Sequence, residues 1–315
     1  LTDPKTAQGL KKNKTFSAFS KNGKGEITEG SPTASTSSDE TSSRPSEKES
    51  NKTHYDNLNV EKMWEEGYTG RGVNVAVFDT GFGNSDSVES PLHEDLPSIN
   101  SSRTYYCFDS GFIFPDETEQ RRCVNNAYNP DDLKNLAKDT DGHGTHVSGI
   151  INAAHNDKGI KGIAPGANLY SFKVADENND MIALKVISAL NTIASSEWKE
   201  KNGKVDIVNM SLSFEEGLQS GAIKFIMNFL FQEENTLFVL SAGNFGTENP
   251  KQNVEDDNGT EYQVSYLAQG EQSIAVANVD ERLKRVTSST TGTGIDIAAP
   301  GSDIWSTVPK EVDTK

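Results

Sequence analysis

An acidic residue, Asp79, directly follows a short apolar run in the sequence. Residues 73–78 read Val-Asn-Val-Ala-Val-Phe, between Gly72 and the tripeptide Asp79-Thr80-Gly81. Such a run predicts a buried strand. We therefore expect Asp79 at the edge of a sheet, where its carboxylate can be buried and hydrogen-bonded. By itself the tripeptide also fits an ordinary junction between a strand and a turn.

The tripeptide has a near copy in Asp109-Ser110-Gly111, and two carboxylates that share a proton could activate a water molecule, as in aspartic proteases. A single-chain aspartic protease distributes its two copies over two similar lobes. Here the copies are only 30 residues apart, with no lobe between them and no apolar strand expected before the second. We therefore reject the aspartic dyad.

The most specific run of the chain is Asp141-Gly142-His143-Gly144-Thr145-His146-Val147-Ser148-Gly149. Glycines on both sides of His143 let the backbone turn sharply into a helix and leave the imidazole open to a substrate. A zinc site must be considered, because His146 and His155 are close to His143 in the sequence. Around a helix they would lie about 60° and about 120° from His143. The chain has no His-Glu-x-x-His, and no Glu falls in this helix to act as a base. Zinc is therefore disfavoured, and we expect His146 to pack in the helix and His155 to lie in a loop.

Two further strand ends carry small polar residues. Residues 211–213 are either an ordinary strand exit or an edge whose backbone pairs with an extended peptide. Asn244 follows the apolar run 238–240 and two small residues. Its amide can donate a hydrogen bond to a developing oxyanion, although an Asn before Gly246 also suits a turn.

The elements that must position these residues follow from apolar periodicity. Strands are expected at 73–78, 169–174, 205–210, 237–241, 273–277 and 295–298, and helices at 59–66, 143–154, 182–198 and 218–231. The last helix is apolar nearly all round, which predicts deep burial. Residues 84–140 are polar, and we expect inserted loops there. The alternation predicts an α/β, doubly wound fold with a mainly parallel sheet and helices on both faces. Ligands bind beyond the carboxyl ends of such strands, where Asp79, Ser211 and Asn244 fall.

Six runs together resemble the subtilisin-like serine protease family over residues 55–315. They are Val75-Ala76-Val77-Phe78-Asp79-Thr80-Gly81, His143-Gly144-Thr145-His146-Val147-Ser148-Gly149, Gly162-Ile163-Ala164-Pro165-Gly166-Ala167, Ser211-Leu212-Ser213, Ser241-Ala242-Gly243-Asn244 and Ala298-Ala299-Pro300-Gly301. The resemblance implies a serine endopeptidase that acts on polypeptides and needs no cofactor for its chemistry. It implies that Asp79 orients and stabilises the imidazolium, that His143 is the general base, and that Asn244 lines the oxyanion hole. The peptide contacts that it implies come from Ser211, Leu212, Ser213, Ala242 and Gly243.

Two departures from the family pattern matter. Ser213 stands where the family usually has Gly, on the strand that binds the substrate backbone. The Gly-Thr-Ser-x-Ala segment that carries the nucleophile is absent from the 315 residues. We therefore expect a fold that is incomplete at its C-terminus, a catalytic serine beyond the end of this chain, and no turnover by these residues alone. The alternative is a catalytically inactive subtilisin-like module that binds peptides or regulates a partner.

The resemblance also implies a structural calcium ion, because family members often bind calcium at the loop after the His-bearing helix. In this chain the ligands would be Asn156 and Asp95, which offer the oxygen atoms that calcium prefers. A solvated turn is the alternative.

The segment 67–72, which precedes the first expected strand, and the long insertions are similar to passenger domains of bacterial autotransporter proteases.

Composition bounds the remaining possibilities. With 30 Lys and Arg against 47 Asp and Glu, the net charge is −17, and no basic cluster indicates nucleic-acid binding. No apolar run is long enough to span a bilayer.

Cys107 and Cys123, 16 residues apart, favour a disulfide in an exported protein, with two unrelated thiols as the alternative. Of the residues 31–50, 11 are Ser or Thr. We therefore expect 1–54 to be a disordered extension or propeptide remnant, before a peptidase domain at 55–315 of a secreted or surface protein.

Overall fold

The structure is a computed structural model that describes residues 10–12, 51–83, 95–96, 103–109, 123–125, 136–157, 159–214, 216–246 and 264–309. The strands are β1 (Leu10–Lys12), β2 (Asn74–Asp79), β3 (Thr104–Cys107), β4 (Cys123–Asn125), β5 (Asn168–Lys173), β6 (Ile207–Met210), β7 (Leu237–Ser241), β8 (Ser273–Val279), β9 (Ile297–Pro300) and β10 (Trp305–Thr307). The helices are α1 (Lys52–Leu58), α2 (Val60–Glu65), α3 (His143–Asn152), α4 (Ala183–Ala194), α5 (Ser196–Asn202) and α6 (Leu218–Glu234), with a 3-10 turn η5 (Tyr266–Ala268).

The central feature is an eight-stranded sheet in the order β4-β3-β5-β2-β6-β7-β8-β9. All neighbours pair in parallel except β3 and β4, which are antiparallel. The predicted mainly parallel sheet is confirmed. Parallel pairing requires crossovers, and helices supply several of them: α4 and α5 lie between β5 and β6, and α6 lies between β6 and β7.

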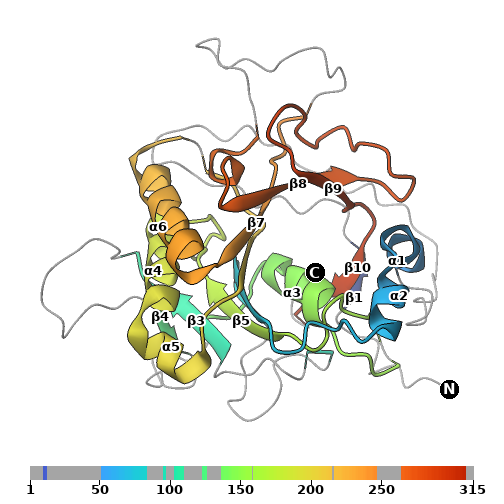
Figure 1. The fold of residues 1–315 in the computed structure, drawn as a ribbon, viewed down its shortest axis with the longest axis horizontal. Helices are drawn as coiled ribbons and strands as arrows, with labels where there is room; N and C mark the ends of the chain where they lie inside the picture. The colour runs from blue at the N-terminus through green and yellow to red at the C-terminus, as the bar shows by residue number, and fades with distance from the viewer. Residues whose placement is uncertain are drawn as a thin grey trace, which may run out of the picture.

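The sheet is covered on both faces. Figure 1 shows α4, α5 and α6 together on one side and α3 on the other. Side-chain burial agrees, because Ala76 and Phe78 of β2 belong to the core that contains α4 and α6, whereas Val77 packs in a second core with Val147 of α3. This alternation is the period of two that a strand imposes, and it accounts for the continuous apolar run that the sequence shows at 73–78.

Helix α6 departs from the prediction of deep burial. Its buried residues, Ser220, Ile223, Met227 and Leu230, form one stripe, whereas Leu218 is 89% exposed and Phe225 is 75% exposed. Among the described elements, α6 packs on α4, η5 and β7, and none of them covers its second apolar face. The prediction of deep burial is therefore wrong for half of this helix.

Other boundaries also differ from the predictions. The helix expected at 182–198 is two helices, since Ser195 ends α4 and accepts a hydrogen bond from Trp198 N as the N-cap of α5. The insertion 84–140, expected to be loops, contributes β3 and β4 to the sheet. The packed region begins before residue 55, because α1 starts at Lys52 and both Asn51 and His54 are buried. Most of 1–54 lies outside the described residues.

The β8–β9 end of the sheet is covered less completely. Ala275 and Ala277 point into the core, but Ile274 and Val276 on the opposite face are half-buried, and Ile297 is 52% exposed among the described residues.

Within the described part of the chain, no helix has the length and apolarity that a membrane span requires.

Candidate active site

Asp79 ends β2 at the carboxyl edge of the sheet and is fully buried. Its Oδ1 accepts a hydrogen bond from the backbone N–H of Thr80, with 2.7 Å between the heavy atoms. Gly81 follows with a φ of 121°, in the region that only glycine adopts readily, and a Cβ there would overlap the carbonyl oxygen of Ala137. The Asp-Thr-Gly run therefore makes a tight turn in which the carboxylate stays on the sheet edge.

His143 is the first residue of α3, and Gly142 before it has a φ of 103°. Gly144 lies against the turn after β2 so closely that a Cβ would overlap Gly81 O. This contact brings the start of α3 onto the end of β2. The two glycines around His143 thus serve the backbone geometry of the turn and the close packing of two segments.

The structure brings Asp79 and His143 together. His143 Nδ1 lies 2.6 Å from Asp79 Oδ1, with the carboxylate fully buried and the imidazole nearly so. Burial lowers the pKa of His143, but the charge and hydrogen bond of Asp79, with the charges of Asp141 and Asp139, raise it to about 9. The hydrogen bond to a buried anion fixes the proton on Nδ1 in the neutral tautomer and stabilises the imidazolium when a second proton arrives.

Sequence reasoning missed Asp139, which organises the loop between Ala137 and α3. The side chain is fully buried, and its oxygens accept hydrogen bonds from Thr80 Oγ1 and from the backbone N–H groups of Gly142 and Thr145. These N–H groups belong to the unpaired donors at a helix start. Asp139 lies three residues before the N-cap Gly142, and Asp141 is nearer to the helix, so a capping signal in the sequence does not single out Asp139.

Sequence reasoning also missed Lys173, the last residue of β5. Its side chain is buried, and Nζ donates to the carbonyl oxygens of Thr80 at 2.7 Å and Lys138 at 2.8 Å. Burial lowers the pKa of this amine. The ammonium thereby connects the turn after β2 to the loop that precedes α3.

The residues predicted to contact peptide lie at the carboxyl ends of β6 and β7. Ser211, Leu212 and Ser213 directly follow β6, and Ser241 Oγ donates to Leu212 O at 3.4 Å. Gly243 has a φ of 109°, and its carbonyl oxygen accepts from Thr290 N. Asn244 comes next and is exposed. Because β2, β6 and β7 are consecutive parallel neighbours, all these residues share one edge with Asp79 and His143.

His146 and His155, the two other histidines weighed for a zinc site, have different surroundings. His146 is buried in α3, and its carbonyl oxygen accepts from Ser306 Oγ; His155 lies after the helix, with Nε2 at 3.0 Å from Gly162 O. Asp109 follows strand β3, so a strand does precede the second Asp-Ser-Gly copy, contrary to the prediction. It is nevertheless exposed, and β5 lies between β3 and β2. Two strand spacings amount to about 10 Å, which rules out an aspartic dyad with Asp79.

Asp95 and Asn156, the residues considered for calcium, are close together. Asn156 Nδ2 lies 3.4 Å from Asp95 Oδ1, and the Asp95 side chain is buried. The backbone of Gly159 approaches so closely that a Cβ would overlap Asp95 Oδ2. Among the described residues there is no group of three His, Cys, Asp or Glu side chains that could hold a metal. A calcium ion here would bind the carboxylate and, after rotation of the amide, the Asn156 oxygen, with backbone carbonyls or water completing the shell.

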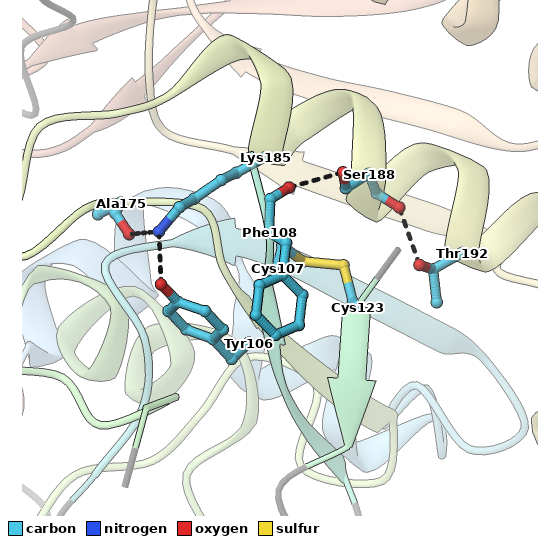
Figure 2. Close-up of a disulfide and its surroundings, with 8 residues drawn as sticks. All are labelled: Tyr106, Cys107, Phe108, Cys123, Ala175, Lys185, Ser188 and Thr192. Carbon is cyan, nitrogen blue, oxygen red and sulfur yellow. Dashed lines mark hydrogen bonds between the residues drawn. A yellow bond between two sulfur atoms is a disulfide. The ribbon is translucent and has the colours of Figure 1, made fainter. Parts of the chain in front are cut away.

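The predicted disulfide is present between Cys107 of β3 and Cys123 of β4, which face each other across the antiparallel pair (Figure 2). Helix α4 packs beside it: Ser188 Oγ donates to Phe108 O at 2.7 Å, and Lys185 Nζ donates to Tyr106 Oη at 3.1 Å. The disulfide therefore holds the short edge strand β4 in the sheet.

The sequence profile described as "Subtilase family" matches residues 70–314. The chain is 30% identical over 250 residues to the minor extracellular protease Epr of Bacillus subtilis, covering 79% of this chain and 30% of that protein. It is 28% identical over 257 residues to subtilisin DY of Bacillus licheniformis, covering 82% and 74% respectively. It is 31% identical over 247 residues to subtilisin E of Bacillus subtilis, covering 78% and 51%. The chain thus spans under a third of one relative and about half of another.

Proposed function

The chain belongs to the subtilase family, and on that premise we propose that it supplies the aspartate and the histidine of the catalytic triad of a serine endopeptidase that hydrolyses peptide bonds in polypeptides. The observation that carries the proposal is the 2.6 Å contact between His143 Nδ1 and Asp79 Oδ1. It lies at the carboxyl edge of a parallel sheet, and both residues stand in runs that match the family.

In this mechanism His143 is the general base. Asp79 accepts a hydrogen bond from Nδ1–H, so the Nε2 atom is the one that takes the proton of a serine hydroxyl as the hydroxyl oxygen attacks the peptide carbonyl. Asp79 then stabilises the imidazolium. The same proton passes to the leaving amine when the C–N bond breaks, and water repeats the sequence on the acyl-enzyme.

The developing oxyanion requires a donor, and Asn244 at the end of β7 is the residue that we propose for it. Residues 211–213 and the pair Ala242 and Gly243 would receive the substrate as an extended strand along the same edge. Ser213 adds a side chain where glycine is usual in the family, so it narrows the space beside the peptide backbone.

The nucleophile is a serine that we place outside the 315 residues, because no Gly-Thr-Ser run occurs within them. The test is the reaction of the protein from its complete reading frame with a fluorophosphonate, a reagent that labels activated serines. We expect one labelled serine, in a Gly-Thr-Ser run that follows Lys315, and loss of labelling in His143→Ala. A complete protein with another residue in place of that serine, and no labelling, would establish the inactive module instead.

We also propose a structural calcium ion bound by Asp95 and Asn156, and secretion from the cell. The proposal is supported by the buried Asp95 carboxylate, which lies 3.4 Å from the side-chain amide of Asn156, because carboxylate and amide oxygens are ligands that calcium prefers. Secretion is supported by the disulfide, because such bonds persist in oxidising compartments. It is also supported by the relative that is named an extracellular protease.

A further inference from the structure

The carboxylate of Asp139 is the most densely hydrogen-bonded acid near the site. Its Oδ1 accepts from Thr80 Oγ1 at 2.9 Å, from Gly142 N at 2.8 Å and from Asp141 N at 3.2 Å. Its Oδ2 accepts from Thr145 N at 2.8 Å and Thr145 Oγ1 at 2.6 Å. The side chain is 0% exposed, so water does not compete for these five bonds.

The donors belong to the two segments that carry Asp79 and the proposed base His143. Thr80 is the neighbour of Asp79, whereas Gly142 and Thr145 flank His143 in the first turn of α3. Both threonine hydroxyls are also used a second time across the same junction. Thr80 Oγ1 accepts from Gly144 N at 2.9 Å, and Thr145 Oγ1 accepts from Gly83 N at 3.0 Å.

No Lys or Arg of the described residues forms an ion pair with Asp139. The nearby ammonium of Lys173 donates to the carbonyl oxygens of Thr80 and Lys138. The buried negative charge is therefore compensated by N–H and O–H donors, which require defined directions, at the positive end of a helix. An arrangement of this kind fixes the relative position of the segments that hold the donors.

We propose that Asp139 is a positioning residue of the active site: its carboxylate fixes the turn after β2 against the first turn of α3 and thereby sets the contact between Asp79 Oδ1 and His143 Nδ1. The Asp139 side chain itself contacts neither the imidazole of His143 nor the substrate. The proposal rests on the proposed function for its biological meaning, but its geometric content concerns the Asp79–His143 hydrogen bond alone.

Several charged groups act on the imidazole, and a test must separate them from the positioning effect. From β2 the group is Asp79, and from the loop before α3 the groups are Asp139 and Asp141. Strand β5 presents Lys173, and β10, which also packs on α3, has no titratable side chain. Asp141 is the matched control. It also raises the pKa of His143, and its Oδ1 accepts from His143 N at 3.1 Å, but it bonds to neither Thr80 nor Thr145.

The experiment is NMR of the 315-residue chain with ¹⁵N-labelled histidine, following the His143 Hδ1 proton and the pH titration of the ring. In the unaltered chain we expect a downfield Hδ1 signal in slow exchange with water. In Asp139→Asn, with the fold verified by circular dichroism, we expect exchange that is about tenfold faster or more, because the hydrogen bond to Asp79 is no longer held. In Asp141→Asn the ring pKa should fall while the Hδ1 exchange rate stays near that of the unaltered chain.

Thr145→Val is the second variant, because it keeps the side-chain shape and the Asp139 charge while it removes one hydroxyl from the network. It should also accelerate Hδ1 exchange, by less than Asp139→Asn does. If Asp139→Asn does not fold, Thr145→Val decides the question. Unchanged Hδ1 exchange in a folded Asp139→Asn or, failing that, in Thr145→Val would overturn the proposal, as would equal acceleration in Asp141→Asn. No step requires peptide hydrolysis, so a protein without peptidase activity can still support or refute it.

Discussion

Lys173 and Asp79 are direct partners in the register of β5 and β2, yet they form no ion pair. Lys173 Nζ instead donates to the carbonyl oxygens of Thr80 and Lys138. The nearest strand partner of Asp79 thus stabilises the surrounding backbone and leaves the carboxylate to His143. A lysine that bound Asp79 directly would compete with the imidazole for the same oxygen and would weaken the base.

The first prediction concerns pH. The pKa of His143 is raised from its ordinary value of 6.5 to about 9, because the effect of Asp79 and the neighbouring acids outweighs burial. A general base must be neutral, so in the complete enzyme kcat/KM should be low at pH 7, rise through about pH 9 and then level off. Initial rates on a peptide substrate from pH 6 to 10.5 measure this. A plateau that is already reached at pH 7 would contradict it.

The same pKa shift affects stability in the opposite direction: high pH, which should favour activity, should lower the free energy of unfolding. Since folding raises the pKa of His143, the charged imidazolium favours the folded state. This contribution is complete below pH 6.5 and is lost as the pH rises through 9. Urea unfolding of the 315-residue chain should therefore show a lower free energy of unfolding at pH 9.5 than at pH 6.5, and His143→Ala should remove that part of the pH dependence.

The second prediction concerns Asn244. In the complete enzyme, Asn244→Ala should lower kcat by about 10²- to 10³-fold with little change in KM, because an oxyanion donor binds the tetrahedral intermediate more strongly than the ground-state carbonyl. His143→Ala should lower kcat further, since the serine hydroxyl then has no base. Steady-state kinetics of the two variants measure both effects. A change confined to KM in Asn244→Ala would place this residue in substrate binding instead.

The third prediction concerns calcium. Calcium added at about 100 times its dissociation constant should raise the free energy of unfolding by about 2.7 kcal/mol, because only the folded state holds Asp95 beside Asn156. Thermal unfolding with calcium and with EDTA measures the shift. Asp95→Asn should abolish it. Asp157→Asn is the control, because this exposed neighbour has a φ of 62°, which Asn tolerates well, and it should retain the response.

The fourth prediction concerns the disulfide. Replacement of Cys107 and Cys123 by serine should lower the free energy of unfolding by about 3 kcal/mol, because the bridge closes a loop with a sequence separation of 16. Denaturant titration of the oxidised chain and of the double variant measures the difference. Dithiothreitol should destabilise the unaltered chain and have no effect on the double variant, which contains no other cysteine.

The fifth prediction compares two residues of α6. Met227 is fully buried, so Met227→Ala should cost about 2–5 kcal/mol. Phe225 is 75% exposed, so Phe225→Ala should change stability by no more than about 0.5 kcal/mol. Denaturation of both variants under one set of conditions measures the contrast. Similar losses for both would mean that the outer face of α6 is covered in the folded protein.

Much of the fold followed from local patterns. The apolar runs at 73–78 and 237–241 identify strands, and the residues just after them lie at the carboxyl edge, because every parallel strand ends on the same side of its sheet. The glycines around Asp79 and His143 indicated tight turns, and such information is local. The chemistry of the two residues came from the resemblance of the six runs together to the subtilisin-like family.

Tertiary structure decided what local patterns cannot express. The exposed face of α6 reflects the absence of a packing partner on one side among the described elements, which an apolar sequence does not reveal. Strands β3 and β4 are short and lie in a polar stretch of the sequence, and the disulfide and β5 hold them in the sheet. The role of Asp139 depends on Thr80, 59 residues earlier in the chain. A carboxylate becomes an organising group only when folding removes water from it and brings distant donors within reach, and the sequence alone gives neither condition.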